Sequence, residues 1–370
     1  MRVDRGSLNY RAALIVEGLA STPVEVGFHR SQSVPRVARW VFFASLIFVS
    51  LVTPTYSLLM DKVSRRRALS VLTLTQPALF ASVFSLHIVF RNTLLVYLIL
   101  IGGLELVSSL YWVTANTLLR DVVTAGNYVS QAGYSEVSSQ VPALIAAGSV
   151  VFLLRLPFEY LLVFGGSLAF GAARLISGIP EYEANSADGN SGNTAWGKNG
   201  FRYVAGAVEF FGYIRKRMVQ VLLVYMIGFP FVFTVAGNFV KPVFIASILH
   251  GDPSFLAFSE AEYAASAIIA GLLIPIVQRR LGDGTTLALL FTAYTSASIV
   301  MPTYASYAVF TVCKAIHGVG NPGSRVVRKA VVLRWVERGE LGRFNGWVSL
   351  LFTLTRIVII GTSTLMIGVG

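Results

Sequence analysis

The chain has 370 residues, of which 55% are hydrophobic and only 13% are charged, whereas a soluble domain is typically about a quarter charged. Its mean hydropathy is +0.67, and apolar runs of about 20 residues, the length at which a helix crosses a bilayer, recur along it. This composition excludes a soluble enzyme and a disordered chain, and the single cysteine, Cys313, excludes an intrachain disulfide. We therefore predict an all-α polytopic membrane protein.

Apolar runs predict about eleven transmembrane helices. In chain order they cover residues 10–28, 37–60, 68–90, 93–118, 132–154, 157–177, 218–240, 257–277, 285–301, 304–320 and 345–367. The segment 242–250 is also apolar, so the seventh span is predicted to be broken or extended. A polar, Asn- and Gly-rich stretch that cannot bury a core separates six spans from five. The predicted domains are an N-terminal six-helix bundle (1–178), a cytoplasmic central loop (179–217) and a C-terminal bundle of five helices (218–370).

The distribution of basic residues predicts the orientation of these spans. If the N-terminus is cytoplasmic, the inner segments contain 22 Lys and Arg residues and the outer segments contain six. Cytoplasmic loops collect Lys and Arg, so this orientation is favoured. The formal charge of +12 is then explained by topology, and no nucleic-acid partner is needed. Contact between the basic segments and anionic lipid headgroups is expected.

Three pairs of landmarks recur at a spacing of about 214 residues and in the same order. They are the basic turns Ser64–Arg67 and Arg279–Gly282, the glycines Gly103 and Gly318, and the segments beginning Gln131-Ala-Gly and Phe344-Asn-Gly. The repetition predicts two parallel homologous halves, an architecture of transporters. The same spacing would start a twelfth span just beyond residue 370, so we expect the chain to lack the last helix of a six-plus-six plan.

The loop after the second span resembles the signature of the major facilitator superfamily, G-x-L-x-D-[RK]-x-G-[RK]-[RK]-x-x-L. The matching residues are Leu59, Asp61, Lys62, Arg65, Arg66 and Leu69. Both glycines of the signature are serine here, Ser57 and Ser64, which predicts a looser approach of the neighbouring helix. In the tenth span, Lys314-Ala-Ile-His317-Gly318-Val-Gly320 is similar to the R-x-x-Q-G-x-G pattern of that superfamily.

The resemblance implies a secondary transporter whose two bundles rock about a central cavity. In that family the signature acid caps a neighbouring helix and pairs with basic residues when the cytoplasmic side is closed. Carried onto this chain, the gating role falls on Asp61, with Lys62, Arg65 and Arg66 as supporting charges and Asp121 as a candidate partner. The alternative is that the basic residues only stop the span on the cytoplasmic side.

Charged side chains within spans are predicted to face a cavity or a partner, because each costs at least about 2.5–3.5 kcal/mol at the bilayer centre. Glu105, Trp112 and Asn116 form a polar stripe on the fourth span. The predicted cavity for substrate and proton is lined by Glu17, Glu105, Trp112, Asn116 and Arg356. Secondary candidates are Glu25, which lies on the same side of the first span as Glu17, and Lys314 and His317, expected nearer the cytoplasm.

Two alternatives are open for these interior charges. In the first, Glu17 or Glu105 carries a coupling proton, while Arg356 binds an anionic group of the substrate or pairs with an acid across the cavity. In the second, a fixed ion pair holds the two halves together. Glu136, near the cytoplasmic end of the fifth span, is expected to pair with cytoplasmic basic residues.

Sequence motifs for other kinds of chemistry are either absent or lie in the wrong structural context. Gly318-x-Gly320-x-x-Gly323 matches a dinucleotide fingerprint but follows an apolar helix rather than a strand. The sequence has no Walker A motif, and its four histidines and one cysteine lack metal-ligand spacing. We therefore predict no enzyme activity, no cofactor and no metal.

The sequence as a whole predicts a multi-pass cell-membrane protein that moves a small solute by alternating access, with proton coupling as a further hypothesis. Its expected partners are a small-molecule substrate, membrane lipid and protons. The alternative function is that of a non-transporting protein on the same scaffold, such as a sensor, a lipid-handling protein or a partner subunit.

Overall fold

The computed structural model describes residues 5–30, 35–90, 93–123, 127–153, 155–181 and 201–369, and within these ranges the chain is helical with no strand. The N-terminal half contains α1 (Arg5–Arg30), α2 (Pro35–Lys62), α3 (Arg65–Phe90), α4 (Thr93–Leu118), α5 (Tyr128–Leu153) and α6 (Phe158–Ser177). The C-terminal half contains α7 (Phe201–Ile227), α8 (Phe229–Ser247), α9 (Pro253–Thr303), α10 (Tyr307–Trp335), the 3₁₀ turn η2 (Arg338–Glu340) and α11 (Leu341–Val369).

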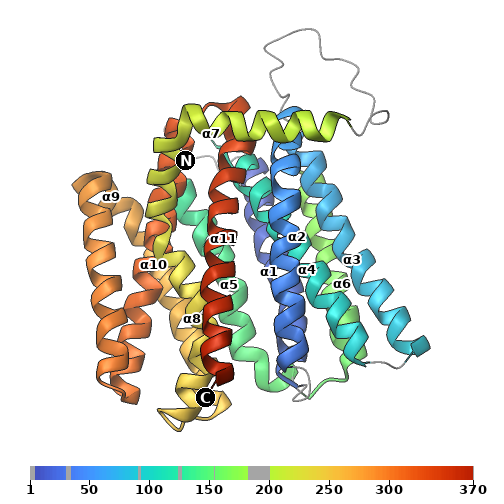
Figure 1. The fold of residues 1–370 in the computed structure, drawn as a ribbon, viewed down its shortest axis with the longest axis vertical. Helices are drawn as coiled ribbons and strands as arrows, with labels where there is room; N and C mark the ends of the chain where they lie inside the picture. The colour runs from blue at the N-terminus through green and yellow to red at the C-terminus, as the bar shows by residue number, and fades with distance from the viewer. Residues whose placement is uncertain are drawn as a thin grey trace.

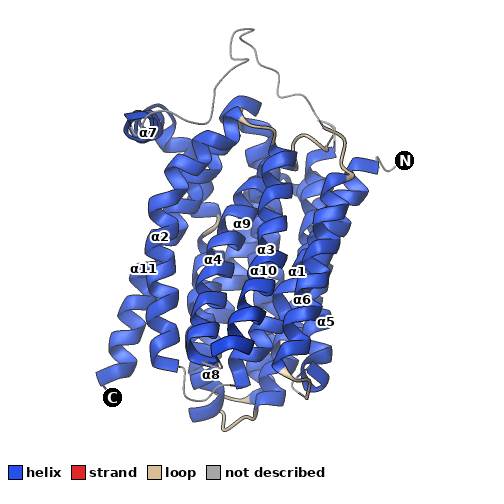
Figure 2. Cartoon of the chain, turned by 90° about the vertical axis from the view of Figure 1, so that its right-hand side faces the viewer, coloured by secondary structure: helices blue, strands red, loops and turns tan. Residues whose placement is uncertain are grey.

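Most helices run side by side along one long axis (Figures 1 and 2). By length and composition, five helical stretches among the described residues are apolar enough to cross a membrane, and the broken pair α7–α8 makes a sixth. Large apolar side chains also point outward; Leu51 and Val219, for example, are each 71% exposed. Hydrogen bonds within each helix satisfy the backbone in lipid. The prediction of an all-α polytopic membrane protein is confirmed, and the count of eleven spans stays a prediction.

Two glycines of the C-terminal half mark a break and a reversal, and both agree with the predicted spans. The seventh span is broken at Gly228, where the axes on either side differ by 50°. Helix α9 covers the predicted eighth and ninth spans and reverses at Gly282, whose φ of +76° suits glycine.

Helix α7 begins at Phe201, inside the segment predicted as the central loop. Its first part lies across one end of the bundle in Figure 1 and is seen end-on in Figure 2.

This end of the molecule, called the basic end below, gathers the α2–α3, α4–α5 and α10–α11 connections and the α9 reversal. Hydrogen bonds such as those from Asn9 to Gly178 and from Arg334 to Asp283 tie its segments together. It contains the inner loops of the predicted topology, so the topology and the fold agree on which loops lie together.

The two halves meet where small residues let backbones approach. A Cβ built on Gly133 of α5 would overlap the carbonyl oxygen of Gly271 in α9, and one built on Gly346 of α11 would overlap Oγ of Ser57 in α2. The looser approach predicted from Ser57 is therefore wrong. The glycine that α2 lacks is supplied by the opposing helix, so the two backbones still come close.

Candidate functional site

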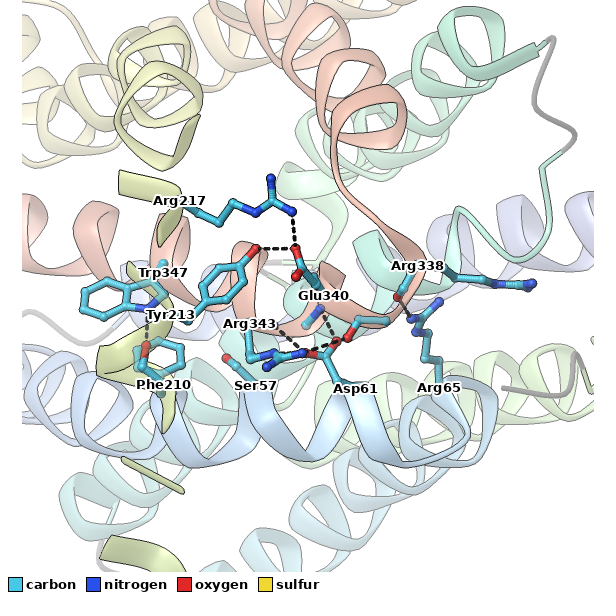
Figure 3. A network of polar contacts seen from close by, with 12 residues as sticks. Ser57, Asp61, Arg65, Phe210, Tyr213, Arg217, Arg338, Glu340, Arg343 and Trp347 are labelled. Atoms are coloured by element: carbon cyan, nitrogen blue, oxygen red, sulfur yellow. Dashed lines mark hydrogen bonds and ion pairs between the residues drawn. The ribbon is translucent and has the colours of Figure 1, made fainter. Parts of the chain in front are cut away.

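The carboxylate of Asp61 fastens the last turn of α2 to the start of α11 (Figure 3). Its Oδ1 accepts a hydrogen bond from the Gly342 N–H at 2.7 Å, and its Oδ2 accepts from the Arg343 N–H at 3.1 Å and from Arg343 Nε at 2.9 Å. The side chain is 5% exposed. The first N–H groups of a helix lack intrahelical partners, and the Asp61 carboxylate supplies acceptors for two of them.

A second ion-pair group joins the halves through Asp121, which follows α4. Its Oδ1 lies 2.8 Å from Nη1 of Arg65 in α3 and 2.7 Å from Nε of Arg338 in η2. Arg65 also donates to the Arg338 carbonyl, and Arg120 donates to the Val336 carbonyl. Asp121 therefore contacts a basic residue of the signature, Arg65, and links it to the C-terminal half.

A third contact between the halves lies deeper, around Glu136 of α5. This side chain is 1% exposed, hydrogen-bonds with Arg325 of α10 and lies 3.6 Å from Lys329 Nζ. The expected pairing of Glu136 with basic residues is confirmed.

One helical turn separates Arg325 from another cation, Arg328, which packs against aromatic rings. Its guanidinium lies 4.8 Å from the Phe352 ring centroid and 5.9 Å from that of Phe231. Its Nη1 is buried and has no hydrogen-bond partner among the described residues. Arg325 and Lys329 thus pair with Glu136 across the halves, while Arg328 packs against aromatic rings of the C-terminal half one turn away, so cations outnumber the acid in this part of α10.

Two residues of the predicted cavity come together across the halves. Nη2 of Arg356 in α11 lies 3.5 Å from Oε1 of Glu105 in α4, and their side chains are 16% and 20% exposed. Of the rest of the stripe, Trp112 packs edge-on against Tyr111 at 5.7 Å, and the buried Oδ1 of Asn116 has no hydrogen-bond partner in the described part of the chain. That these two residues line the same cavity stays a prediction.

Glu17 lies inside the N-terminal half, 3% exposed. Nε2 of Gln76 in α3 donates to its Oε1 at 2.9 Å. Arg66 likewise bonds within that half, to the Ser177 carbonyl at 2.6 Å. The side chains of Glu25 and Lys62 lie outside the described residues.

The secondary candidates Lys314 and His317 lie in the half of α10 remote from the basic end, because α10 begins at Tyr307 on the opposite side of the bundle. Their expected position nearer the cytoplasm is therefore wrong. Lys314 Nζ lies 3.4 Å from Glu260 of α9, which also pairs with Lys241 of α8. His317 Nε2 lies 2.9 Å from Ser298 Oγ. The sequence reasoning missed Glu260, although an acid in an apolar span was a usable signal.

Comparison with known proteins shows similarity in structure alone. No family model and no curated protein sequence matches the chain. The human organic anion transporter MFSD10 (TETRAN) superposes with a TM-score of 0.70 at 14% identity, over 96% of this chain and 92% of that chain. A bacterial homologue of the iron transporter ferroportin in its outward-facing state gives 0.70 at 14% identity, over 99% and 92%. The same homologue with soaked iron gives 0.69 with the same identity and coverage.

Proposed function

Because the chain has the fold of major facilitator superfamily transporters, we propose that it moves a small solute across the cell membrane by alternating access. The contacts that join the halves at the basic end carry this proposal. Asp61 with the start of α11, and Asp121 with Arg338, are polar contacts between separate bundles. Such contacts can part without unfolding either bundle, so they suit a gate that opens and closes.

The charge between the halves favours an anionic solute. Arg325 and Lys329 share the acid Glu136 there, and the neighbouring Arg328 has an Nη1 with no hydrogen-bond partner among the described residues. A carboxylate or phosphate would supply the missing charge and acceptors. The similarity to an organic anion transporter agrees with this preference.

The pair of Glu105 and Arg356 is the proposed proton-coupling element. A proton on Glu105 would remove its negative charge and release Arg356 for the anionic group of the solute. Because the pair bridges α4 and α11, its state depends on how the halves sit. Glu17, which bonds to Gln76 within one half, is the comparison residue.

A thermal-unfolding screen of the purified protein against small carboxylates, organic phosphates and their neutral analogues tests the proposal. Anions that raise Tm are then offered to proteoliposomes with and without a pH gradient. We expect uptake of at least one anion, stimulated by the gradient in the wild type and in E17Q but not in E105Q. If no stabilising anion is taken up, the proposal of anion transport is wrong; if E105Q keeps the gradient dependence, only the coupling role of Glu105 is wrong.

A further inference from the structure

A cavity of about 470 Å³ lies at the basic end, between α7 and the start of α11, and the transport proposal does not use it. Its position beside the Asp61 contact can be followed in Figure 3, where Tyr213 and Arg217 of α7 face Glu340 and Arg343. The cavity is lined by Gly212, Tyr213, Lys216, Arg217, Glu340 and Arg343.

The lining has an excess of positive charge and few free acceptors. Glu340 is the only acid among the lining residues, and its Oε2 already lies 3.2 Å from Arg217 Nη2 and accepts from Tyr213 Oη at 3.2 Å. Arg343 Nε bonds to Asp61. Within the described part of the chain, Lys216 has no polar partner. Cationic donors around a small cavity favour a ligand with several anionic oxygens.

The position of α7 indicates that the cavity lies at the level of lipid headgroups. The first part of the helix lies across the end of the bundle (Figures 1 and 2). It exposes Val208 and Phe211, at 67% and 53%, together with the basic residues Arg215 and Lys216. Exposed apolar and basic side chains on one helix are typical of a helix in the membrane interface.

Aromatic packing holds α7 in this place. The Phe210 ring stacks on Trp347 of α11 with centroids 4.6 Å apart, and Trp347 Nε1 donates to the Phe210 carbonyl at 2.8 Å. The two walls of the cavity therefore have a fixed separation, which a binding site requires.

We propose that this cavity binds the phosphate of an anionic phospholipid, with Lys216 and Arg217 as its cationic contacts. The cytoplasmic leaflet is the one that carries anionic lipid, and the basic end is predicted to face it. Arg343 lines the cavity and also contacts Asp61, so a bound phosphate competes with that carboxylate for the guanidinium. Lipid binding thereby loosens the contact between α2 and α11.

Native mass spectrometry of the purified protein, titrated with phosphatidylglycerol or phosphatidylcholine, tests the site without any transported solute. The key variant is K216A, and the matched control is R215A, which removes a neighbouring exposed cation that does not line the cavity. Losing one charge-assisted contact is expected to weaken phosphatidylglycerol binding about tenfold in K216A, with R215A and K216R close to wild type. Phosphatidylcholine is expected to bind weakly to all four proteins.

Three outcomes would overturn the proposal. Equal losses in K216A and R215A would mean diffuse attraction to a basic surface, and unchanged binding in K216A would exclude the cavity. Inorganic phosphate could also displace phosphatidylglycerol, at concentrations at which it stabilises the protein without lipid. That result would identify a site for free phosphate instead. Because the measurement involves no solute, failure here leaves the transport proposal untouched.

Discussion

Replacing Asp61 by Asn tests whether this carboxylate holds the basic end closed. The wild-type side chain accepts three hydrogen bonds from the first residues of α11 and is 5% exposed. Asn has the same shape but has no charge and only one accepting oxygen. D61N therefore weakens the closed state without removing side-chain volume.

The expected size of the effect follows from these contacts. A hydrogen bond to a charged group contributes about 1.5–3 kcal/mol, and D61N loses the charge and at least one bond. A loss of about 3 kcal/mol would raise the ratio of open to closed protein roughly a hundredfold. A basic end that is open in about 1% of molecules would then be open in about half of them.

Spin labels on the two halves report this change. Ser177 of α6 and Leu281 of α9 are exposed at the basic end, and the buried Cys313 is first replaced by Ser. Pulsed electron resonance of the S177C/L281C protein should show a single distance, with a second, longer distance appearing in D61N. The matched control is D283N, because Asp283 pairs with Arg334 inside the C-terminal half. An unchanged distance distribution in D61N, or the same change in D283N, would refute the reasoning.

Three further predictions concern stability. G346A should lower Tm, because a Cβ at this position overlaps Ser57 Oγ at a cost of about 1–3 kcal/mol. Adding S57G to G346A should restore Tm. A G346A protein with wild-type Tm would contradict this packing. E260Q should lower the free energy of unfolding by about 1–3 kcal/mol, because Lys241 and Lys314 lose their shared acid. The loss should be smaller than for a fully buried pair, because the Glu260 side chain is 40% exposed. Adding K314M should recover part of the loss. At the basic end, hydrogen bonds from Ser64 and Arg67 lower the pKa of Glu181 below 4.5. Its stabilisation is present above pH 4.5 and lost as the pH falls through the lowered value, so Tm should drop less on acidification in E181Q than in wild type.

The signature loop shows how far local sequence predicts a site. The signature identifies Asp61 and Arg65 because its residues are close together in the sequence. Their partners, Gly342 and Arg338, are more than 270 residues away and belong to a segment without any distinctive motif. Neither helical periodicity nor residue spacing predicts that pairing, because it forms only when the two halves of the chain pack together.

Interior charges show the same limit. The cost of a charge in lipid predicts that Glu105 and Arg356 need partners, and in the structure they pair with each other. The same argument applies to Glu17, yet Glu17 bonds to Gln76 within the N-terminal half of the chain. The free-energy cost of a charge in lipid indicates that the charge needs a partner, but it does not indicate which helix supplies that partner. The depth predicted for Lys314 is wrong because the tenth helix continues to Trp335, well beyond its apolar run.

The sequence by itself determined the membrane class, the all-helical fold, the grouping of the basic loops at one end and the acid at the end of α2. These depend on hydropathy, charge counts and short spacings, which are properties of neighbouring residues. Only the tertiary structure decided that α7 lies across the basic end, that Gly346 makes room for Ser57, and that Lys216 and Arg217 line a cavity. Those features depend on how side chains that are distant in the sequence pack against each other, and this packing is set only when the whole bundle is assembled.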